Sequence, residues 1–299
     1  MFTVAALFSL NYIVSKVAMH SFAALSFAWL RVAGAAILLN VFTSRRTGNP
    51  AFPDRQDRLS SSDSWKITGF AILGVALNQT MFLGGLSLTN AHVAAILITT
   101  IPVFTLIVAI ILRLERTTVT KVGGIALALA GALLVVSGEG SSGMTGAVAG
   151  TLLIIGNCMA YAVYLVVSKP VVSRLSPTRV IARMFAIGAV LILPIALPSL
   201  LRQEWRSIPS SAWLGLLVVI AGPTVGAYVI NAWTLKYAEA SVVAAYSYLQ
   251  PVLTTIMAWA FLHERIRPIV AVAGLMIFGG VGLASSKRGR RTEAGGGVE

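Results

Sequence analysis

The feature that most constrains this chain is a succession of ten apolar segments, most of them close to the length of a membrane-spanning helix. A helix needs about 20 mostly apolar residues to cross a bilayer. The longest polar stretch between segments, about residues 44 to 66, is too short for a separate domain. The sequence therefore predicts ten transmembrane helices, at residues 2–19, 25–43, 67–85, 91–112, 119–137, 148–167, 180–201, 212–234, 240–262 and 268–285.

Charged residues are scarce and lie between these segments. Of the 299 residues, 57% are hydrophobic and 11% are charged, whereas a soluble domain has about 25% charged residues. All ten acidic residues lie outside the middle of an apolar segment. The net charge of +13 comes from Lys and Arg in short connecting segments, which fits anionic lipid headgroups better than nucleic acid. We therefore expect an all-α integral membrane protein with the lipid bilayer as partner and no nucleic acid.

The distribution of Lys and Arg predicts how the chain is oriented. The first segment contains Asn11 and Lys16 and lacks both a basic n-region and a cleavage site, so it is interpreted as a helix and not as a signal peptide. With the N-terminus inside, 17 basic residues fall in inner segments and four in outer ones. The positive-inside rule then places both termini in the cytoplasm of a multi-pass protein of the cell membrane, plasma or inner.

The two halves of the chain repeat each other. The repeat predicts two five-helix units, at 1–138 and 147–286, followed by a basic, disordered cytoplasmic tail at 287–299. Because five is odd, the second unit enters the membrane inverted, which is typical of secondary transporters, although duplicated channels also occur. The matching features are Ser15-Lys16 with Ser168-Lys169, and Pro102 lying 13 residues before Glu115 with Pro251 lying 13 residues before Glu264.

Several stretches resemble a known family. They are "SLNYIVSKVAMHSFAALSFAWLR", "LGVALNQTMFLGGLSLTNAHVAAILITTIPVFTLIVAIILRLERTT" and "EASVVAAYSYLQPVLTTIMAWAFLHERI". They look like the signature stretches of EamA-type members of the drug/metabolite transporter superfamily. The resemblance implies a ten-helix exporter-type fold with a central cavity between the halves, and a small-molecule solute such as an amino acid, a metabolite or a drug. One departure is His263, where the family often has glycine before the glutamate.

Polar residues inside the apolar segments are candidates for lining that cavity, because a polar side chain in hydrocarbon needs a partner or a wet cavity. Hydrogen bonds that only hold helices together are the alternative. Many of these residues fall in matching helices of the two halves. The candidates are Asn11, Asn78, Gln79, Thr99, Thr100, Asn157, Tyr161, Tyr164, Tyr228, Asn231, Tyr246 and Gln250.

A second group of residues lies where helices bend or end. A proline removes a backbone donor and kinks a helix, so the paired prolines are candidate bend points, with a static kink as the alternative. The helix-end glutamates are expected to form an ion pair or to cap the next helix, or else to latch a gate. We expect the side chains of Lys16 and Arg31 to extend to the membrane interface. Alternatively, they make one opening of the cavity electropositive, so that it attracts carboxylates. The kink or gate candidates are Pro102, Pro251, Glu115, Glu264, Lys16 and Lys169.

No constellation for catalysis occurs in the sequence. The three histidines are scattered, the single Cys158 excludes an intrachain disulfide, and no P-loop is present. We expect no catalytic residues, no metal and no cofactor. The alternatives to a transporter are a channel or a non-transporting scaffold, and, less favoured, a membrane-embedded enzyme. Without an acid at mid-membrane, the transporter would work by exchange or facilitated diffusion, or by proton coupling through His92 or a helix-end glutamate.

Small residues recur at four-residue steps on the fifth and tenth predicted helices. Such steps let two backbones approach closely. Packing within the chain and a homodimer through these two helices both fit the pattern. The residues are Gly124, Ala128 and Ala132 on the fifth helix and Gly274 and Gly282 on the tenth.

Overall fold

The computed structural model describes residues 2–47, 60–114, 117–140, 146–237, 249–264 and 267–284, in which every regular element is a helix. Glu115, Tyr246 and the tail at 287–299 lie outside these residues. The first half contains α1 (Phe2–Ala18), α2 (Ala24–Thr47), α3 (Ser61–Ala71), η1 (Ile72–Leu77), α4 (Asn78–Leu88), α5 (Ala91–Ile98), α6 (Ile101–Ile111) and α7 (Val119–Gly140). The second half contains α8 (Ala147–Arg174), α9 (Pro177–Arg202), η2 (Trp205–Ser207), α10 (Ser210–Val219), η3 (Ile220–Gly226), α11 (Ala227–Tyr237), α13 (Leu249–Leu262) and α14 (Pro268–Ala284).

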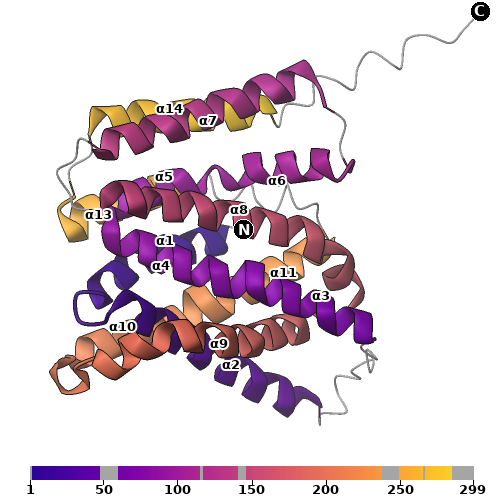
Figure 1. Cartoon of the computed structure of the whole chain (residues 1–299), viewed down its shortest axis with the longest axis vertical. Helices are drawn as coiled ribbons and strands as arrows, with labels where there is room; N and C mark the ends of the chain where they lie inside the picture. The colour runs from indigo at the N-terminus through magenta and orange to yellow at the C-terminus, as the bar shows by residue number, and fades with distance from the viewer. Residues whose placement is uncertain are drawn as a thin grey trace, which may run out of the picture.

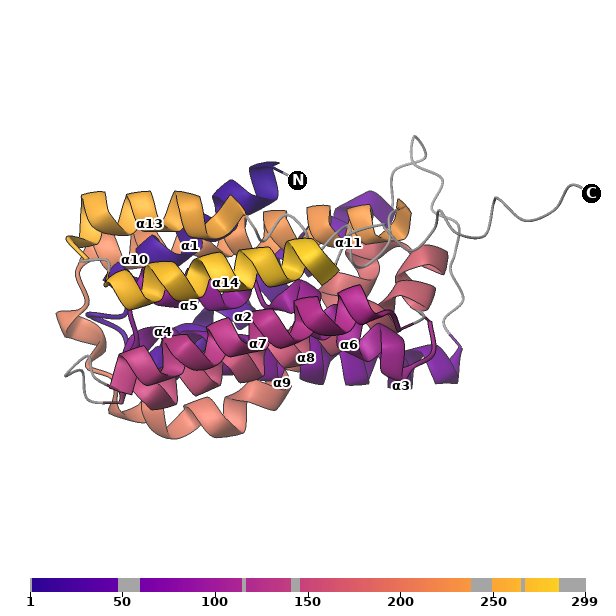
Figure 2. The same cartoon turned by 90° about the horizontal axis from the view of Figure 1, so that it is seen from above.

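The helices run roughly along one common direction and form a bundle (Figure 1; Figure 2). At one edge α7 packs against α14, and at the opposite edge α2 packs against α9. Between these pairs, α1 packs mainly against α13 and α10, and α8 packs mainly against α4 and α6. The two helices α1 and α8 therefore occupy the interior, where polar side chains of either half can meet.

The lengths and the surface of the helices suit a membrane. Within the described residues, seven helical units are long and apolar enough to span it: Ala24–Ser44, Ser61–Leu88, Ala91–Ile111, Val119–Gly138, Ala147–Arg174, Pro177–Arg202 and Ser210–Tyr237. Three shorter apolar helices, Phe2–Ala18, Leu249–Leu262 and Pro268–Leu283, coincide with the remaining expected segments. Large apolar side chains such as Ile37, Leu133 and Leu275 are exposed on the outside, where lipid is the matching solvent.

The third helical unit begins six residues earlier than the hydrophobic pattern predicts. Ser60 caps α3 by accepting a hydrogen bond from the backbone N–H of Asp63, and the Asp63 carboxylate accepts one from the backbone N–H of Ser60. Asp63 also pairs with Arg174 at the end of α8. This reciprocal cap lets polar residues continue the helix beyond the apolar run, which hydropathy alone does not detect.

The third and eighth helical units are interrupted at matching places by π-helical turns, η1 and η3. The fourth unit is interrupted as well: α5 ends at Ile98, and α6 starts at Ile101 with Pro102 in its first turn. The kink expected at Pro102 is thus a break just ahead of the proline. Pro251 lies in the first turn of α13, and the residues before Leu249 lie outside the described part of the chain.

Small residues on α7 and α14 are used for packing within the chain. A Cβ atom added to Gly280 on α14 would lie 2.5 Å from the backbone nitrogen of Ala128 and 2.6 Å from the carbonyl oxygen of Gly124 on α7. Gly274 faces Ile96, and Gly282 has no atom within 4 Å of such a Cβ. The α7 face that contains Gly124 and Ala128 is therefore occupied by α14, and a homodimer through these helices would have to use their outer sides.

Candidate functional site

Asn78, the first residue of α4, is the centre of a hydrogen-bond network that joins the two halves. Its side-chain oxygen accepts hydrogen bonds from the Tyr228 hydroxyl at 2.7 Å and from Gln79 Nε2 at 3.1 Å. Its backbone carbonyl accepts one from Asn157 Nδ2 at 2.8 Å. All four side chains are buried. Because a buried polar group costs free energy unless it is paired, this network holds α4, α8 and α11 in register.

Arg31 on α2 makes a second buried contact between the halves. Its Nε donates to Thr224 Oγ1 in η3 at 2.6 Å, and the Thr224 hydroxyl donates to the carbonyl of Val219 at 2.7 Å. Arg31 is only 1% exposed. The expectation that Arg31 snorkels to the membrane surface is therefore wrong. The residue lies about 10 Å along α2 from its start, and its guanidinium is held by η3 inside the bundle.

Two further contacts attach α1 to α13. The Tyr12 hydroxyl donates to Gln250 Oε1 at 3.3 Å, and the Ser9 hydroxyl donates to the backbone carbonyl of Gln250 at 3.4 Å. Asn11, on the same helix as Tyr12, accepts a hydrogen bond from Ser15 at 3.0 Å. These polar contacts bring Gln250, from the start of α13, beside the network around Asn78.

The side chains of these networks surround a cavity of about 50 Å³. A water molecule needs about 10–15 Å³ measured in this way, so the cavity has room for a few waters, whereas ligand pockets usually enclose roughly 300–1,000 Å³. The described conformation is thus contracted around its polar centre. The lining residues are Phe8, Asn11, Tyr12, Arg31, Asn78, Gln79, Phe82, Ile98, Ile101, Asn157, Tyr161, Tyr228 and Gln250.

Seven of the predicted cavity residues line this space, and they come from both halves of the chain: Asn11, Asn78, Gln79, Asn157, Tyr161, Tyr228 and Gln250. Four others lie outside its lining. Asn231 donates a hydrogen bond to the Tyr161 hydroxyl, and the Tyr164 ring lies tilted against the Tyr161 ring, with 5.5 Å between the ring centroids. The hydroxyls of Thr99 and Thr100 donate to carbonyls of their own helix, at Ile96 and Leu97.

A larger hollow of about 780 Å³ lies at the surface, between the turn that follows α1 and the end of α9. His20, Arg202, Gln203 and Glu204 are among the residues around it, and none of the predicted site residues is. The central cavity differs from this hollow because buried polar side chains from distant parts of the chain converge on it. We therefore take the central cavity as the candidate site.

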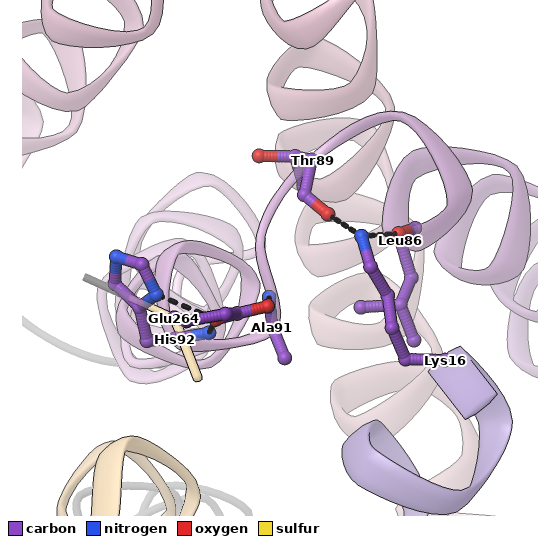
Figure 3. Close-up of polar contacts among 6 residues, drawn as sticks. All are labelled: Lys16, Leu86, Thr89, Ala91, His92 and Glu264. Atoms are coloured by element: carbon purple, nitrogen blue, oxygen red, sulfur yellow. Dashed lines mark hydrogen bonds and ion pairs between the residues drawn. The ribbon is translucent and has the colours of Figure 1, made fainter. Parts of the chain in front are cut away.

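One end of the bundle is held by two charged side chains that reach across from other helices (Figure 3). Lys16 Nζ donates to the carbonyl of Leu86 at 2.9 Å and to that of Thr89, at the C-terminal end of α4. Glu264 accepts hydrogen bonds from the backbone N–H groups of Ala91 at 2.9 Å and His92 at 3.2 Å, at the start of α5. The positive Lys16 therefore lies at the negative, C-terminal end of α4, and the negative Glu264 lies at the positive, N-terminal end of α5. Both positions are favourable for the helix dipole. We call this pair of contacts the end clamp.

Glu264 was expected to form an ion pair, to cap the next helix or to latch a gate, and in the structure it caps α5 of the other half and not the helix that follows it. Its Oε2 also lies 2.6 Å from Nδ1 of His92, which gives that histidine a partner. The backbone at His263 makes this reach feasible, with φ at 53° in the left-handed region that favours glycine. The departure from glycine at His263 thus falls where the chain turns sharply out of α13. Lys169, the repeat counterpart of Lys16, is half-buried near the end of α8.

Acid should weaken the end clamp. Burial alone would raise the pKa of the Glu264 carboxyl, but hydrogen bonds from the His92 side chain and from the N–H groups of Ala91 and His92 outweigh it and hold that pKa below its ordinary value. Such a group stabilises the folded state above its ordinary pKa, and this stabilisation is lost as the pH falls through the folded-state pKa. We expect Glu264→Gln to cost about 1 kcal/mol of stability near neutral pH, and this cost to shrink as the pH falls through the lowered pKa of Glu264.

Thermal unfolding of the purified protein in detergent, measured from neutral to acidic pH, checks the prediction. The matched control is Glu204→Gln, because Glu204 is an exposed glutamate next to η2. A penalty for Glu264→Gln that is the same at neutral pH and at the most acidic pH at which the wild type still folds would show that the charge on Glu264 does not hold the clamp.

Sequence reasoning missed Arg31, which lines the cavity, and Thr224, which holds the Arg31 side chain. Arg31 was noticed only as a basic residue near a helix end, and Thr224 was not singled out. The position of Arg31, seven residues after the start of α2, was the available signal, because an interfacial arginine belongs in the first turn or so. Nothing in the sequence indicated that η3 would present a hydroxyl to it.

Known proteins resemble this chain over most of its length. A solved crystal structure covers 99% of the chain, and 99% of that structure is matched, with a TM-score of 0.64 and 21% identity, which indicates a shared fold. An uncharacterized transporter of Archaeoglobus fulgidus is 29% identical over 77% of this chain and 78% of its own length. The uncharacterized transporter YvbV of Bacillus subtilis is 26% identical over 91% of this chain and 85% of its own.

A relative with a named solute also matches. It is a probable terminal-alkyne amino-acid exporter of Streptantibioticus cattleyicolor, 26% identical over 74% of this chain and 73% of its own length. The sequence profile of the EamA-like transporter family matches the chain twice, at residues 1–137 and 148–286. These matches confirm the resemblance found in the signature stretches. The chain belongs to the EamA-like transporter family.

Proposed function

We propose that this protein is a secondary transporter that exports small organic solutes by alternating access around the central cavity. One observation carries the proposal: the buried cavity is lined by polar side chains from both halves. A transporter needs such a site near the middle of the membrane, between two units that can move against each other. The naming of one relative as an amino-acid exporter supports both the direction and the size of the solute.

The same proposal includes ten membrane-spanning helices in two inverted units, 1–138 and 147–286, with both termini in the cytoplasm. The helix packing supports this arrangement, because the main contacts of helices in one unit have matching contacts of their repeat counterparts in the other unit. Both α2 with α9 and α7 with α14 pair a helix with its own repeat counterpart. The contacts of α1 with the eighth helical unit and with α13 correspond to those of α8 with the third helical unit and with α6.

The end clamp supports the idea that one end of the cavity closes. It connects α1 and the α13–α14 turn to the junction between α4 and α5. Under the proposed topology, these groups all lie on the outer side of the membrane. Release of Lys16 and Glu264 from the two helix ends would let the helices of the two units separate there.

Two measurements test the function. Metabolite profiles of cells and medium, with the gene overexpressed or deleted, identify the exported solute. Purified protein in liposomes should then move that solute with saturation, and unlabelled solute inside should accelerate entry of labelled solute. Movement without saturation or acceleration would indicate a channel, and no movement would indicate a scaffold. Either result would overturn the proposal.

A further inference from the structure

Arg31 places a positive charge inside the bundle, and no carboxylate in the described part of the chain pairs with it. The buried Asp63 pairs with Arg174, and the half-buried Glu264 pairs with His92. The Arg31 Nη1 nitrogen is buried and has no hydrogen-bond partner among the described residues. An uncompensated buried charge is strongly unfavourable, and ionisable groups at membrane depth tend to mark the path of a substrate. The negative charge that compensates Arg31 is therefore expected to come from a ligand in the cavity.

The contact with Thr224 orients the guanidinium for such a ligand. Nε is engaged by Thr224 Oγ1, which is itself fixed by its bond to Val219. The side chain is thus held in place through its Nε, and the terminal nitrogens are left for another partner. A planar guanidinium presents parallel N–H groups that match the two oxygens of a carboxylate.

Two free acceptors lie in the same cavity. Gln79 Oε1 and Asn157 Oδ1 are buried and have no partner among the residues that the structure describes. Their amide nitrogens are already engaged, Gln79 with Asn78 and Tyr228, and Asn157 with the carbonyl of Asn78. The orientation of both amides is therefore set, with the oxygens free to accept a hydrogen bond from an N–H or O–H group.

We propose that the cavity binds a small organic carboxylate whose carboxylate pairs with Arg31 and whose ammonium or hydroxyl group donates to Gln79 or Asn157. α-Amino and α-hydroxy acids are the simplest solutes of this class. The rings of Tyr161 and Phe82, which also line the cavity, provide apolar surface for the rest of the solute. This inference rests on the proposed transport function, and the contracted cavity must widen to admit the solute.

Binding is tested first, without transport. Thermal unfolding of the purified protein is recorded with L-leucine, L-phenylalanine and L-lactate, and with their matched amides leucinamide, phenylalaninamide and lactamide. We expect at least one acid to raise the midpoint by about 5 °C at saturation. The matching amide should need at least about tenfold higher concentration for the same shift, because it lacks the negative charge.

Variants of Arg31 then separate ligand binding from a structural role. Arg31→Gln should reduce the preference for the acid over its amide at least about tenfold, while Arg31→Lys should keep part of it, because lysine retains the charge but not the parallel N–H groups. Thr80→Val is the control and should leave the preference unchanged, because the Thr80 hydroxyl donates only to the carbonyls of Ala76 and Leu77. If a variant only destabilised the protein, the acid and its amide would be affected equally. The ratio of the two concentrations needed for the same shift therefore reports recognition of the carboxylate.

The proposal and the proposed function fail in different ways. Equal shifts by acids and amides, a preference unchanged in Arg31→Gln, or no shift by any acid would overturn the carboxylate site. If metabolite profiling and liposome exchange nevertheless identify a neutral or cationic solute, the transport function stands without that site. If no solute moves in liposomes, the transport function itself is overturned.

Discussion

Gly280→Leu is expected to lower the thermal midpoint of the purified protein by roughly 10 °C. Gly280 lies where α14 crosses α7, and its missing side chain lets the two backbones touch. An added Cβ would meet the backbone nitrogen of Ala128 at 2.5 Å and the carbonyl oxygen of Gly124 at 2.6 Å. Backbone atoms of a helix cannot rotate away as a side chain can. The leucine must therefore push α7 and α14 apart.

Gly282→Leu is the matched control for this prediction. Gly282 lies on the same helix, and a Cβ there has no atom within 4 Å. The same glycine-to-leucine change should therefore leave the midpoint within about 2 °C of the wild type. Thermal unfolding of both variants in one detergent makes the comparison. Equal losses in the two variants would show that the close contact between α7 and α14 does not stabilise the protein.

Asn78→Leu should reduce solute exchange in liposomes at least about tenfold. The substitution keeps the shape of the side chain but removes the oxygen that accepts hydrogen bonds from Tyr228 and Gln79. Tyr228 would keep only its longer hydrogen bond to the Gly74 carbonyl, at 3.3 Å, and Gln79 only its bond to Tyr228. Two buried hydrogen bonds, each worth about 0.5–1.5 kcal/mol, would therefore be lost. The groups that line the cavity would then rearrange, and the link between α4 and α11 would weaken. Initial exchange rates of the solute found by metabolite profiling provide the measurement.

Thr80→Val is the control for Asn78→Leu. It is also a shape-preserving change from a polar to an apolar side chain, two residues away. The Thr80 hydroxyl donates only to carbonyls of its own helix, at Ala76 and Leu77. Its replacement should leave exchange within about twofold of the wild type. If both variants lost exchange to the same degree, the hydrogen-bond network around Asn78 would have no special role.

The positions of the helices could be predicted because hydropathy is a local property. The expected apolar segments overlap helical units over the residues that the structure describes, and polar residues in the third and eighth predicted helices directed attention to Asn78 and Tyr228. The early start at Ser60 was missed because it depends on a reciprocal cap with Asp63 in a polar stretch. Local chemistry of that kind is visible in the sequence, but hydropathy does not record it.

The remaining features depend on contacts between distant parts of the chain. Arg31 is separated by 193 residues from Thr224, and Glu264 by 172 from His92. A hydrophobic pattern cannot tell an arginine at the interface from one held by a π-helical turn. It also cannot tell a glutamate that caps its own neighbour from one that caps a helix of the other half. Both distinctions require the fold.

The central claim, that one polar cavity opens alternately to the two sides, is tested most directly by thiol labelling. Cys158 is the only cysteine, so Cys158→Ser gives a background in which Ile98→Cys places a single thiol at the cavity wall. Ile37→Cys, on the exposed surface of α2, is the control that a membrane-impermeant reagent should not reach. We predict that such a reagent labels Ile98→Cys from either side of the membrane and that the transported solute slows labelling from both. Labelling from one side only, or labelling from both sides that the solute does not slow, would contradict the account.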